Sequence, residues 1–399
     1  MRRFLLSMVT AAVLASGGSG ATAGAAIATG ARTAGCLPTA RPGGVAARIV
    51  DIARTARREL DLGAALVRVS AGGREVVTAA VGESMTGVPA TTGMHFRVGA
   101  VGIAYLDIVL LQLVEEGVVS LDEPIARWMP TLPRAGEVTL RMLGASTSGY
   151  PDYVTYDPFI ARFYADPFRH WTPREVIDLA MKRPLWYDPG TNWSYSHANF
   201  VILGEILARV TGTPVARLLR ERVLTPLGLT ETVSRDDAVI PQPVLHGYTI
   251  ERGRYEDSTY WSPSWTTAPG AILTSDICDL AVSARAVGTG RLLSPGSRRI
   301  QLDPGTVGLG GPTATCPAAI CVHHTRENHF GFGVTVEDGW IRQNPSFAGY
   351  AAVQTYLPGR DIAIAVATTR GRTTTEVNTA MTVADRIATL LTGASGSAG

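Results

Sequence analysis

Strand patterns lie near both ends of the chain and are scarce between them, and this distribution limits the possible folds more than any other feature. Near the start, AALVRVS and VVTAAVG are joined by a turn that contains Gly72 and Gly73, which predicts a β-hairpin. Near the end, GFGVTVEDGW, YAAVQTYLP and DIAIAVATT predict three further strands. Amphipathic helical patterns, VAARIVDIARTARREL and MTVADRIATLLTG, stand outside the two groups. This order predicts an α+β fold in which one antiparallel sheet, flanked by helices, is built from both ends of the chain.

The middle of the chain has a different character. Between about residues 120 and 270, helical patterns such as PREVIDLAMKR and ANFVILGEILARVTG alternate with loops rich in Pro, Tyr and Trp. We therefore expect an α/β lobe from residues 37–99 and 271–392, a mainly helical lobe from 100–270, and a flexible tail over 393–399. A cleft between two such lobes is the natural place for a ligand.

The first residues predict export. Two arginines and the apolar segment FLLSMVTAAVLA precede a Gly/Ala-rich region with a candidate cleavage site, ATA, so residues 1–36 are expected to be a signal peptide and leader. The segment TAGC also resembles a bacterial lipobox, which would make Cys36 a lipidated N-terminus. We expect a secreted or cell-envelope protein that is anchored to a membrane only if Cys36 carries a lipid.

The other cysteines divide into a pair and a single residue. Cys316 and Cys321 are close enough in TCPAAIC to close a small loop, and export favours a disulfide between them. A metal site with the histidines of VHHTRENH is the alternative, but it lacks the paired ligand spacing of zinc sites. Cys278, in the apolar run DICDLAVSA, is expected to be a buried small hydrophobic residue. We expect neither a metal nor another cofactor.

Composition excludes other partners. Hydrophobic residues make up 46% of the chain and charged residues 18%, as in globular proteins with a filled core. The formal net charge is +2 and no basic run is present, so no nucleic-acid partner is expected. A monomer is expected. The chain contains a single lysine, Lys182.

Several strings, together with the order of elements, resemble the serine β-lactamase and D-alanyl-D-alanine carboxypeptidase family, which includes penicillin-binding proteins. The resemblance is to its class C-like branch. The strings are MHFRVGAV, LLQLVEEGVVSLDEPIARWMP, VTLRMLGASTSGYPDY, PGTNWSYSHANFVILGEIL, VLTPLGLTET and the closing FGFGV, FAGY and DIAIAVATT. The strings lie between residues 94 and 369, and the resemblance extends from about residue 50 to residue 390. The resemblance implies that family's fold, with three catalytic motifs around a cleft between the lobes.

The first family motif is Ser-x-x-Lys at the start of a buried helix, where the lysine amine helps to remove the serine proton. The matching stretch here is FRVGAVGI, residues 96–103, with Ala100 at the serine position and Ile103 at the lysine position. Neither side chain can attack, donate or accept. Lys182 has Leu179 three residues before it, so no Ser-x-x-Lys occurs elsewhere in the chain.

The other two motifs are partly kept. Tyr195-Ser196-His197 stands at the position of the family's Tyr-x-Asn, whose phenol acts as a general base or acid. Gln343-Asn344-Pro345 stands at the position of the family's Lys- or His-Thr-Gly, which meets the substrate carboxylate. Gln343 is neutral, so the cation of that motif is absent.

Two hypotheses follow from these substitutions. The first is a catalytically inactive protein of the serine hydrolase fold, a pseudoenzyme whose cleft binds a peptidoglycan stem peptide or an envelope protein. Its candidate ligand-binding residues are Arg97, Tyr195, His197, Trp261, Gln343 and Asn344. The second is an active hydrolase (esterase, carboxypeptidase or β-lactamase) with a substitute nucleophile, for which Ser146, Ser148 and Ser196 are the candidates.

Overall fold

The computed structural model describes residues 36–99, 101–376 and 378–393, which belong to one compact unit, Cys36–Gly399. Two predictions lie wholly or largely outside these residues: the signal peptide and leader over 1–36, of which only Cys36 is described, and the methyl side chain at Ala100. The predicted tail is described only at Gly393.

Nine strands of the described residues form one antiparallel sheet, as the sequence predicts. The strand order is β3-β2-β1-β14-β13-β11-β10-β9, with β12 paired to β13. The central pair joins β1 to β14, so the sheet is indeed built from both ends of the chain. The strand bounds are β1 Leu62–Ala71, β2 Arg74–Met85, β3 Val88–Pro89, β9 Asn328–Phe330, β10 Thr335–Glu337, β11 Trp340–Gln343, β12 Ser346–Phe347, β13 Tyr350–Leu357 and β14 Ile362–Arg370.

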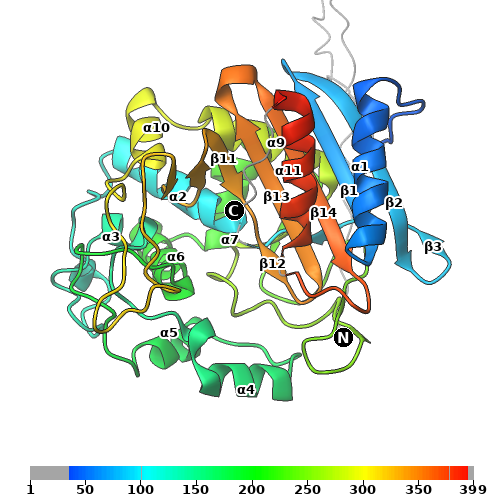
Figure 1. Cartoon of the computed structure of the whole chain (residues 1–399). Coiled ribbons are helices and arrows are strands. Elements are labelled where there is room, and N and C mark those ends of the chain that lie inside the picture. The colour runs from blue at the N-terminus through cyan, green and yellow to red at the C-terminus, as the bar shows by residue number, and fades with distance from the viewer. Residues whose placement is uncertain (1–35, 100, 377, 394–399) are drawn as a thin grey trace, which may run out of the picture. The chain divides into compact units, whose positions relative to one another are not determined.

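Helices cover both faces of this sheet, which explains why its central strands are apolar at successive positions. In β1, Ala65 and Val67 face a core shared with α1 (Val45–Glu59) and α11 (Thr379–Thr392), whereas Leu66 faces the larger core on the other side. Figure 1 shows α1 and α11 side by side on one face, with α9 (Ile277–Thr289) on the opposite face. The predicted layers are therefore confirmed.

The middle of the chain is mainly helical, in agreement with its sequence pattern. Its long central helix is α2 (Val101–Glu115), which is buried along nearly its whole length. Around it lie α3 Leu140–Gly144, α4 Asp157–Ala165, α5 Pro173–Ala180, α6 His197–Thr211, α7 Val215–Leu219, α8 Thr225–Leu227 and, further along the chain, α10 Pro295–Leu302. The division into lobes at 99/100 and 270/271 stays a prediction.

Short strands connect the two regions. Two small sheets form from β4 Phe96–Arg97, β8 Ile272–Ser275 and β5 Val233–Arg235, and from β6 Tyr248–Thr249 and β7 Glu256–Asp257. Strand β4 leads directly into α2, so β4 and β8 help to position the start of that helix. Within the described part of the chain, no helix combines the length and the apolar character needed to cross a bilayer.

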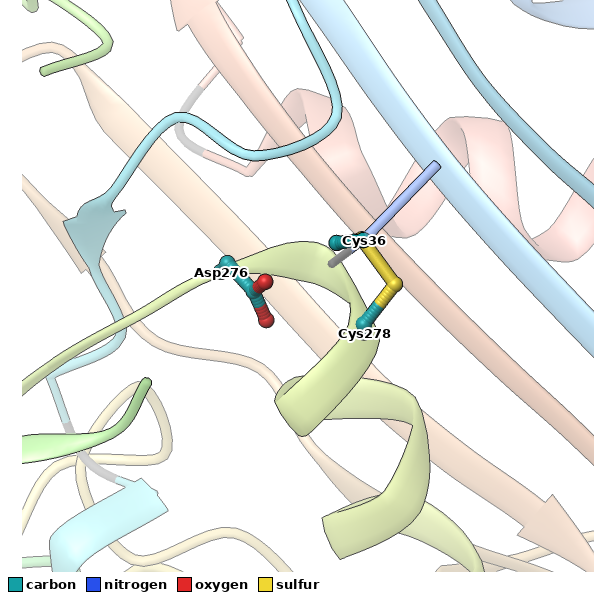
Figure 2. Close-up of side chains that lie close together, drawn as sticks. All are labelled: Cys36, Asp276 and Cys278. Atoms are coloured by element: carbon teal, nitrogen blue, oxygen red, sulfur yellow. A yellow bond between two sulfur atoms is a disulfide. The ribbon is translucent and has the colours of Figure 1, made fainter. Parts of the chain in front are cut away.

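The cysteines form two disulfides. The predicted bond between Cys316 and Cys321 is confirmed. A second bond joins Cys36 to Cys278, 242 residues further along the chain (Figure 2). This bond contradicts two predictions, since Cys278 is not a free hydrophobic side chain and the Cys36 sulfur is not available for a lipid thioether. The Asp276 carboxylate lies within 4.8 Å of both sulfurs, but their mutual bond leaves no free thiolate for a metal.

Candidate functional site

A cavity of about 480 Å³ lies where the starts of α2 and α6 meet the end of β11 and the segment that follows it. Its walls come from segments far apart in the sequence, so only the tertiary fold assembles it. The lining residues are Gly99, Ile103, Val154, Trp193, Tyr195, His197, Trp265, Thr266, Phe330, Thr335, Gln343, Asn344, Pro345, Ser346 and Phe347. Five of the six predicted motif positions, Ile103, Tyr195, His197, Gln343 and Asn344, are therefore brought together.

The start of α2 forms one wall of the cavity. Gly99 has φ +43°, and a Cβ at that position would lie 2.9 Å from the Pro345 Cβ, so glycine allows the two segments to touch. Ile103 lies within the first turns of α2, is 1% exposed and presents an aliphatic group to the cavity. This wall contributes packing surface and no titratable group.

Tyr195 lies two residues before the start of α6 and lines the cavity. No described residue forms a hydrogen bond with its hydroxyl, although other buried tyrosines of the protein, such as Tyr105 and Tyr150, have partners. Burial raises the pKa of Tyr195 well above its usual value, and the carboxylates of Asp152 and Asp107 add to this effect. The side chain is therefore protonated at physiological pH and offers a neutral hydrogen-bond donor.

His197, the first residue of α6, is held by a carboxylate that the sequence did not reveal. Its Nδ1 donates to Asp152 Oδ2 over 2.8 Å, and the other oxygen, Asp152 Oδ1, accepts from the backbone N–H of Val154 over 3.1 Å. The Asp152 side chain is only 8% exposed, which keeps the pair in a fixed geometry. The structure gives His197 Nε2 no partner among the described residues, and the ring lines the cavity.

The end of β11 supplies another wall. Gln343 is 7% exposed, and no described residue forms a hydrogen bond with its side-chain amide, which lines the cavity. Asn344 is exposed, and its backbone carbonyl accepts from the Asn378 side chain over 2.5 Å. This bond ties the segment after β11 to the cap of α11.

Aromatic and neutral groups dominate the cavity. Trp193, Trp265, Phe330 and Phe347 provide most of its apolar surface, and no lysine or arginine occurs among its lining residues. The carboxylate of Asp152 already pairs with His197. A ligand without net charge therefore matches the site better than a carboxylate does.

Two of the predicted ligand-binding residues lie away from the cavity. The Arg97 guanidinium is buried and donates to the carbonyl oxygens of Ala238, Thr259 and Trp261 at 2.8, 3.1 and 3.5 Å. Burial lowers the pKa of Arg97 to about 10. The Trp261 side chain is fully buried. Arg97 thus holds loop backbone together, and Trp265 lines the cavity instead of Trp261.

The three candidate substitute nucleophiles are also buried outside the cavity. Ser148 donates to the Asn199 side chain over 2.6 Å, and Ser196 donates to the Pro151 carbonyl over 3.1 Å. Ser146 is fully buried as well. Among the residues that line the cavity, the one serine is Ser346 in β12, whose exposed position has no counterpart in the sequence-based hypotheses.

Comparison with known proteins agrees with the fold. The Beta-lactamase family profile matches residues 51–388. Putative penicillin-binding protein PbpX of Bacillus subtilis is 26% identical over 223 residues, or 54% of this chain and 52% of that protein. Esterase EstB of Burkholderia gladioli is 26% identical over 279 residues, or 61% of this chain and 70% of that protein.

Among solved structures, D-amino acid amidase from Ochrobactrum anthropi SV3, complexed with L-phenylalanine amide, has a TM-score of 0.74 at 22% identity. The match covers 88% of this chain and 99% of that one. At this identity the likeness concerns the fold alone. Alignments with several other curated relatives span 36–43% of the relatives' lengths. The profile match over most of the chain, together with the sheet, the central helix and the cleft at its start, shows that the protein belongs to the beta-lactamase family.

Proposed function

We propose that this protein is an exported binding protein whose cavity recognises an uncharged ligand of the cell envelope without forming an acyl-enzyme. One observation carries the proposal. Tyr195, His197 and Gln343 direct hydrogen-bonding groups that have no described protein partner into one neutral, aromatic cavity, where Ile103 replaces the lysine of the family motif. Buried polar groups without partners cost free energy, which a ligand or water that pairs with them recovers.

The envelope partner that we propose is a peptidoglycan stem peptide or an envelope protein segment. Peptide amides offer both donors and acceptors to the phenol, the imidazole and the amide of the cavity. A free terminal carboxylate finds no cation among the lining residues. We therefore propose that the site prefers an internal or amidated peptide segment to a free carboxyl end.

The binding test uses the full chain with its disulfides and two forms of a synthetic stem pentapeptide that ends in D-Ala-D-Ala, one with a free carboxylate and one amidated. Titration calorimetry, supported by quenching of tryptophan fluorescence from Trp193 and Trp265, measures both affinities. We expect saturable binding at one site, with the amide bound more tightly. Absence of binding by both forms would contradict the proposal.

Side-chain variants connect binding to the cavity. Y195F and Q343L each remove one hydrogen-bonding group, so each should weaken binding roughly 5-fold, since a net hydrogen bond contributes about 1 kcal/mol. Y260F is the matched control, because Tyr260 is 42% exposed and does not line the cavity. Equal affinities for Y195F and the native protein would exclude the cavity as the binding site.

The alternative function is an active serine hydrolase that uses Ser346. The exposed position of this serine in the cavity favours it over Ser146, Ser148 and Ser196. A fluorophosphonate probe and a fluorescent penicillin distinguish the two functions, since covalent labelling requires an activated nucleophile. Labelling that maps to Ser346 by mass spectrometry would favour the hydrolase, and we expect none.

The proposed location is outside the cytoplasm, either secreted or on the cell envelope. Two disulfides in the described residues support it, since such bonds persist in oxidising compartments. The export signal predicted from the first residues agrees with this location. N-terminal sequencing of the protein from the culture medium of an expressing bacterium would test cleavage of the predicted signal peptide.

A further inference from the structure

We infer that the pair His197–Asp152 is a general base that activates a water molecule for direct hydrolysis of a neutral carboxylic ester bound in the cavity. This activity goes beyond the proposed recognition function and uses no protein nucleophile. The inference rests on the same cavity as the proposed function, but on different contacts.

The hydrogen bonds of the pair determine which nitrogen is the base. Asp152 accepts the Nδ1 proton of His197 at 2.8 Å, and the Val154 N–H orients the same carboxylate from its other oxygen. An imidazole whose Nδ1–H is used in this way carries its lone pair on Nε2. Since Nε2 has no described protein partner and the ring lines the cavity, its free lone pair is available to a water molecule there.

Tyr195 complements the base. Its ring centroid lies 5.0 Å from that of His197 and the two planes are nearly perpendicular, at 88°. The raised pKa of Tyr195 keeps the phenol protonated, so its O–H can donate to an oxygen that gains negative charge. Base and donor therefore border the same volume, as hydrolysis of an ester requires.

The proposed reaction balances without a cofactor. Water attacks the acyl carbon as His197 Nε2 takes one of its protons, and the carbonyl oxygen becomes an oxyanion that accepts from the Tyr195 O–H. Collapse of this intermediate breaks the bond between the acyl carbon and the ester oxygen. The departing alkoxide takes the proton from the imidazolium, which Asp152 has stabilised. Ester and water thus yield a carboxylic acid and an alcohol, and His197 returns to its neutral form.

The lining residues define the class of ester. The lining contains no lysine or arginine, so an acyl group with its own carboxylate would have no cationic partner in the cavity. Trp193, Trp265 and Phe347 instead offer apolar contact to a neutral acyl or aryl group. The product acid, once ionised, finds no cation to retain it. A short neutral acyl ester of an aromatic alcohol is therefore the suitable probe.

A second histidine–carboxylate pair serves as the internal control. His246 Nδ1 and Asp257 Oδ2 are 3.1 Å apart, but neither residue lines the cavity. H246N removes an equivalent pair and should leave ester hydrolysis unchanged. H197N and D152N instead remove the base and the group that orients it.

The experiment measures 4-nitrophenyl butyrate hydrolysis by the full chain and these three variants, with circular dichroism to verify folding. We expect saturable turnover without an initial burst, and a loss of about 100-fold or more in kcat for H197N and D152N with little change in KM. A solvent deuterium isotope effect on kcat should accompany the native activity, since a proton moves in the proposed step.

Three results would overturn the inference: no saturable turnover by the native protein, full activity of H197N, or a burst with covalent labelling of Ser346. Stem-peptide binding without ester turnover would contradict only this inference. Turnover that depends on His197 without stem-peptide binding would contradict only the proposed ligand.

Discussion

At the scale of single residues, the most unusual group of the protein is Asp107 in the middle of α2. Its side chain is fully buried, and neither carboxylate oxygen has a hydrogen-bond partner among the described residues. Gly144 and Gly333 enclose it, because a Cβ at either glycine would lie 2.8 Å from one of its oxygens. Burial raises the pKa of Asp107 well above its usual value of 3.8, so the carboxyl group favours its protonated form.

Replacing Asp107 by asparagine should stabilise the protein at neutral pH. Asp107 ionises near pH 4 in the unfolded chain, whereas burial gives it a higher pKa in the folded protein. Between these two pKa values, each pH unit lowers the free energy of unfolding by about 1.4 kcal/mol. D107N removes this titration, so its free energy of unfolding at pH 7 should exceed that of the native protein by up to about 4 kcal/mol. Urea unfolding of both proteins measures the difference.

The pH dependence fixes the sign of this prediction. Because the folded-state pKa of Asp107 is raised, the native protein loses stability relative to D107N as the pH rises above about 4, and the two converge in acid. D178N is the matched control, since Asp178 is exposed on α5 and its replacement should change stability little at any pH. A gain for D107N that is equal at pH 4 and pH 7 would show that ionisation is not its cause.

The residues of the site differ in how far the sequence could predict them. Tyr195, Gln343 and Ile103 were found through strings that resemble known motifs, since such motifs mark positions in a fold. Asp152 was missed, because it is 45 residues from His197 and only folding brings their side chains together. Arg97 was misplaced as a ligand-binding residue, because no local pattern indicates that its guanidinium is buried and donates to carbonyls of distant loops.

At the scale of elements, the strands and long helices were predicted well because burial imposes a period on them. The consecutive apolar residues of β1 and the apolar run of α2 indicate that both faces of the strand and nearly the whole helix are covered. Short strands such as β4 and β12 have only two residues each, which is too few for any period. Since β12 lines the site, the fold was more predictable than the cavity walls.

Helix α2 packs closely against Ala271, the residue before β8, and a substitution in α2 can test how much this contact contributes to stability. A Cβ at Gly102 would lie 1.9 Å from the backbone carbonyl oxygen of Ala271, which cannot move without displacing β8. G102A should therefore destabilise the protein by about 1–3 kcal/mol, the usual cost of overpacking, and should disturb the cavity wall at Ile103. Thermal unfolding measures the loss.

The control is the same substitution in α10. Gly296 lies in that helix with only the Ser294 hydroxyl nearby, at 3.6 Å, so a methyl group fits there. G296A should leave stability unchanged or raise it by up to about 1 kcal/mol, since alanine favours helix more than glycine does. If both variants lose the same stability, loss of glycine itself and not contact with Ala271 would be responsible.

At the scale of the whole molecule, the two disulfides should contribute very different amounts of stability. Cys316–Cys321 closes a loop of sequence separation 5, whereas Cys36–Cys278 spans 242 residues and fastens the first described residue to α9. Loop entropy in the unfolded chain predicts contributions of about 2 and about 5 kcal/mol, respectively. The paired variants C316A/C321A and C36A/C278A, compared by urea unfolding, test this difference.

The order of these two losses is the discriminating result. A larger loss for C316A/C321A would show that contacts of the short loop, such as the hydrogen bond from the Thr315 hydroxyl to the Trp186 carbonyl, outweigh chain entropy. The long bond could not have been predicted from spacing, because 242 residues separate its two cysteines and only the tertiary fold brings them together.

The pairing of β1 with β14 also determines when this protein can fold. Leu66 pairs with Ala367 and Val69 with Ile364, so strands from opposite ends of the chain are neighbours in the centre of the sheet. A ribosome that has made β1 must therefore complete almost the entire polypeptide before its partner strand exists. Closure of so long a loop is slow, because its entropy is lost before any contact compensates for it. Until then β1 lacks its partner in the centre of the sheet, and the sheet cannot be completed.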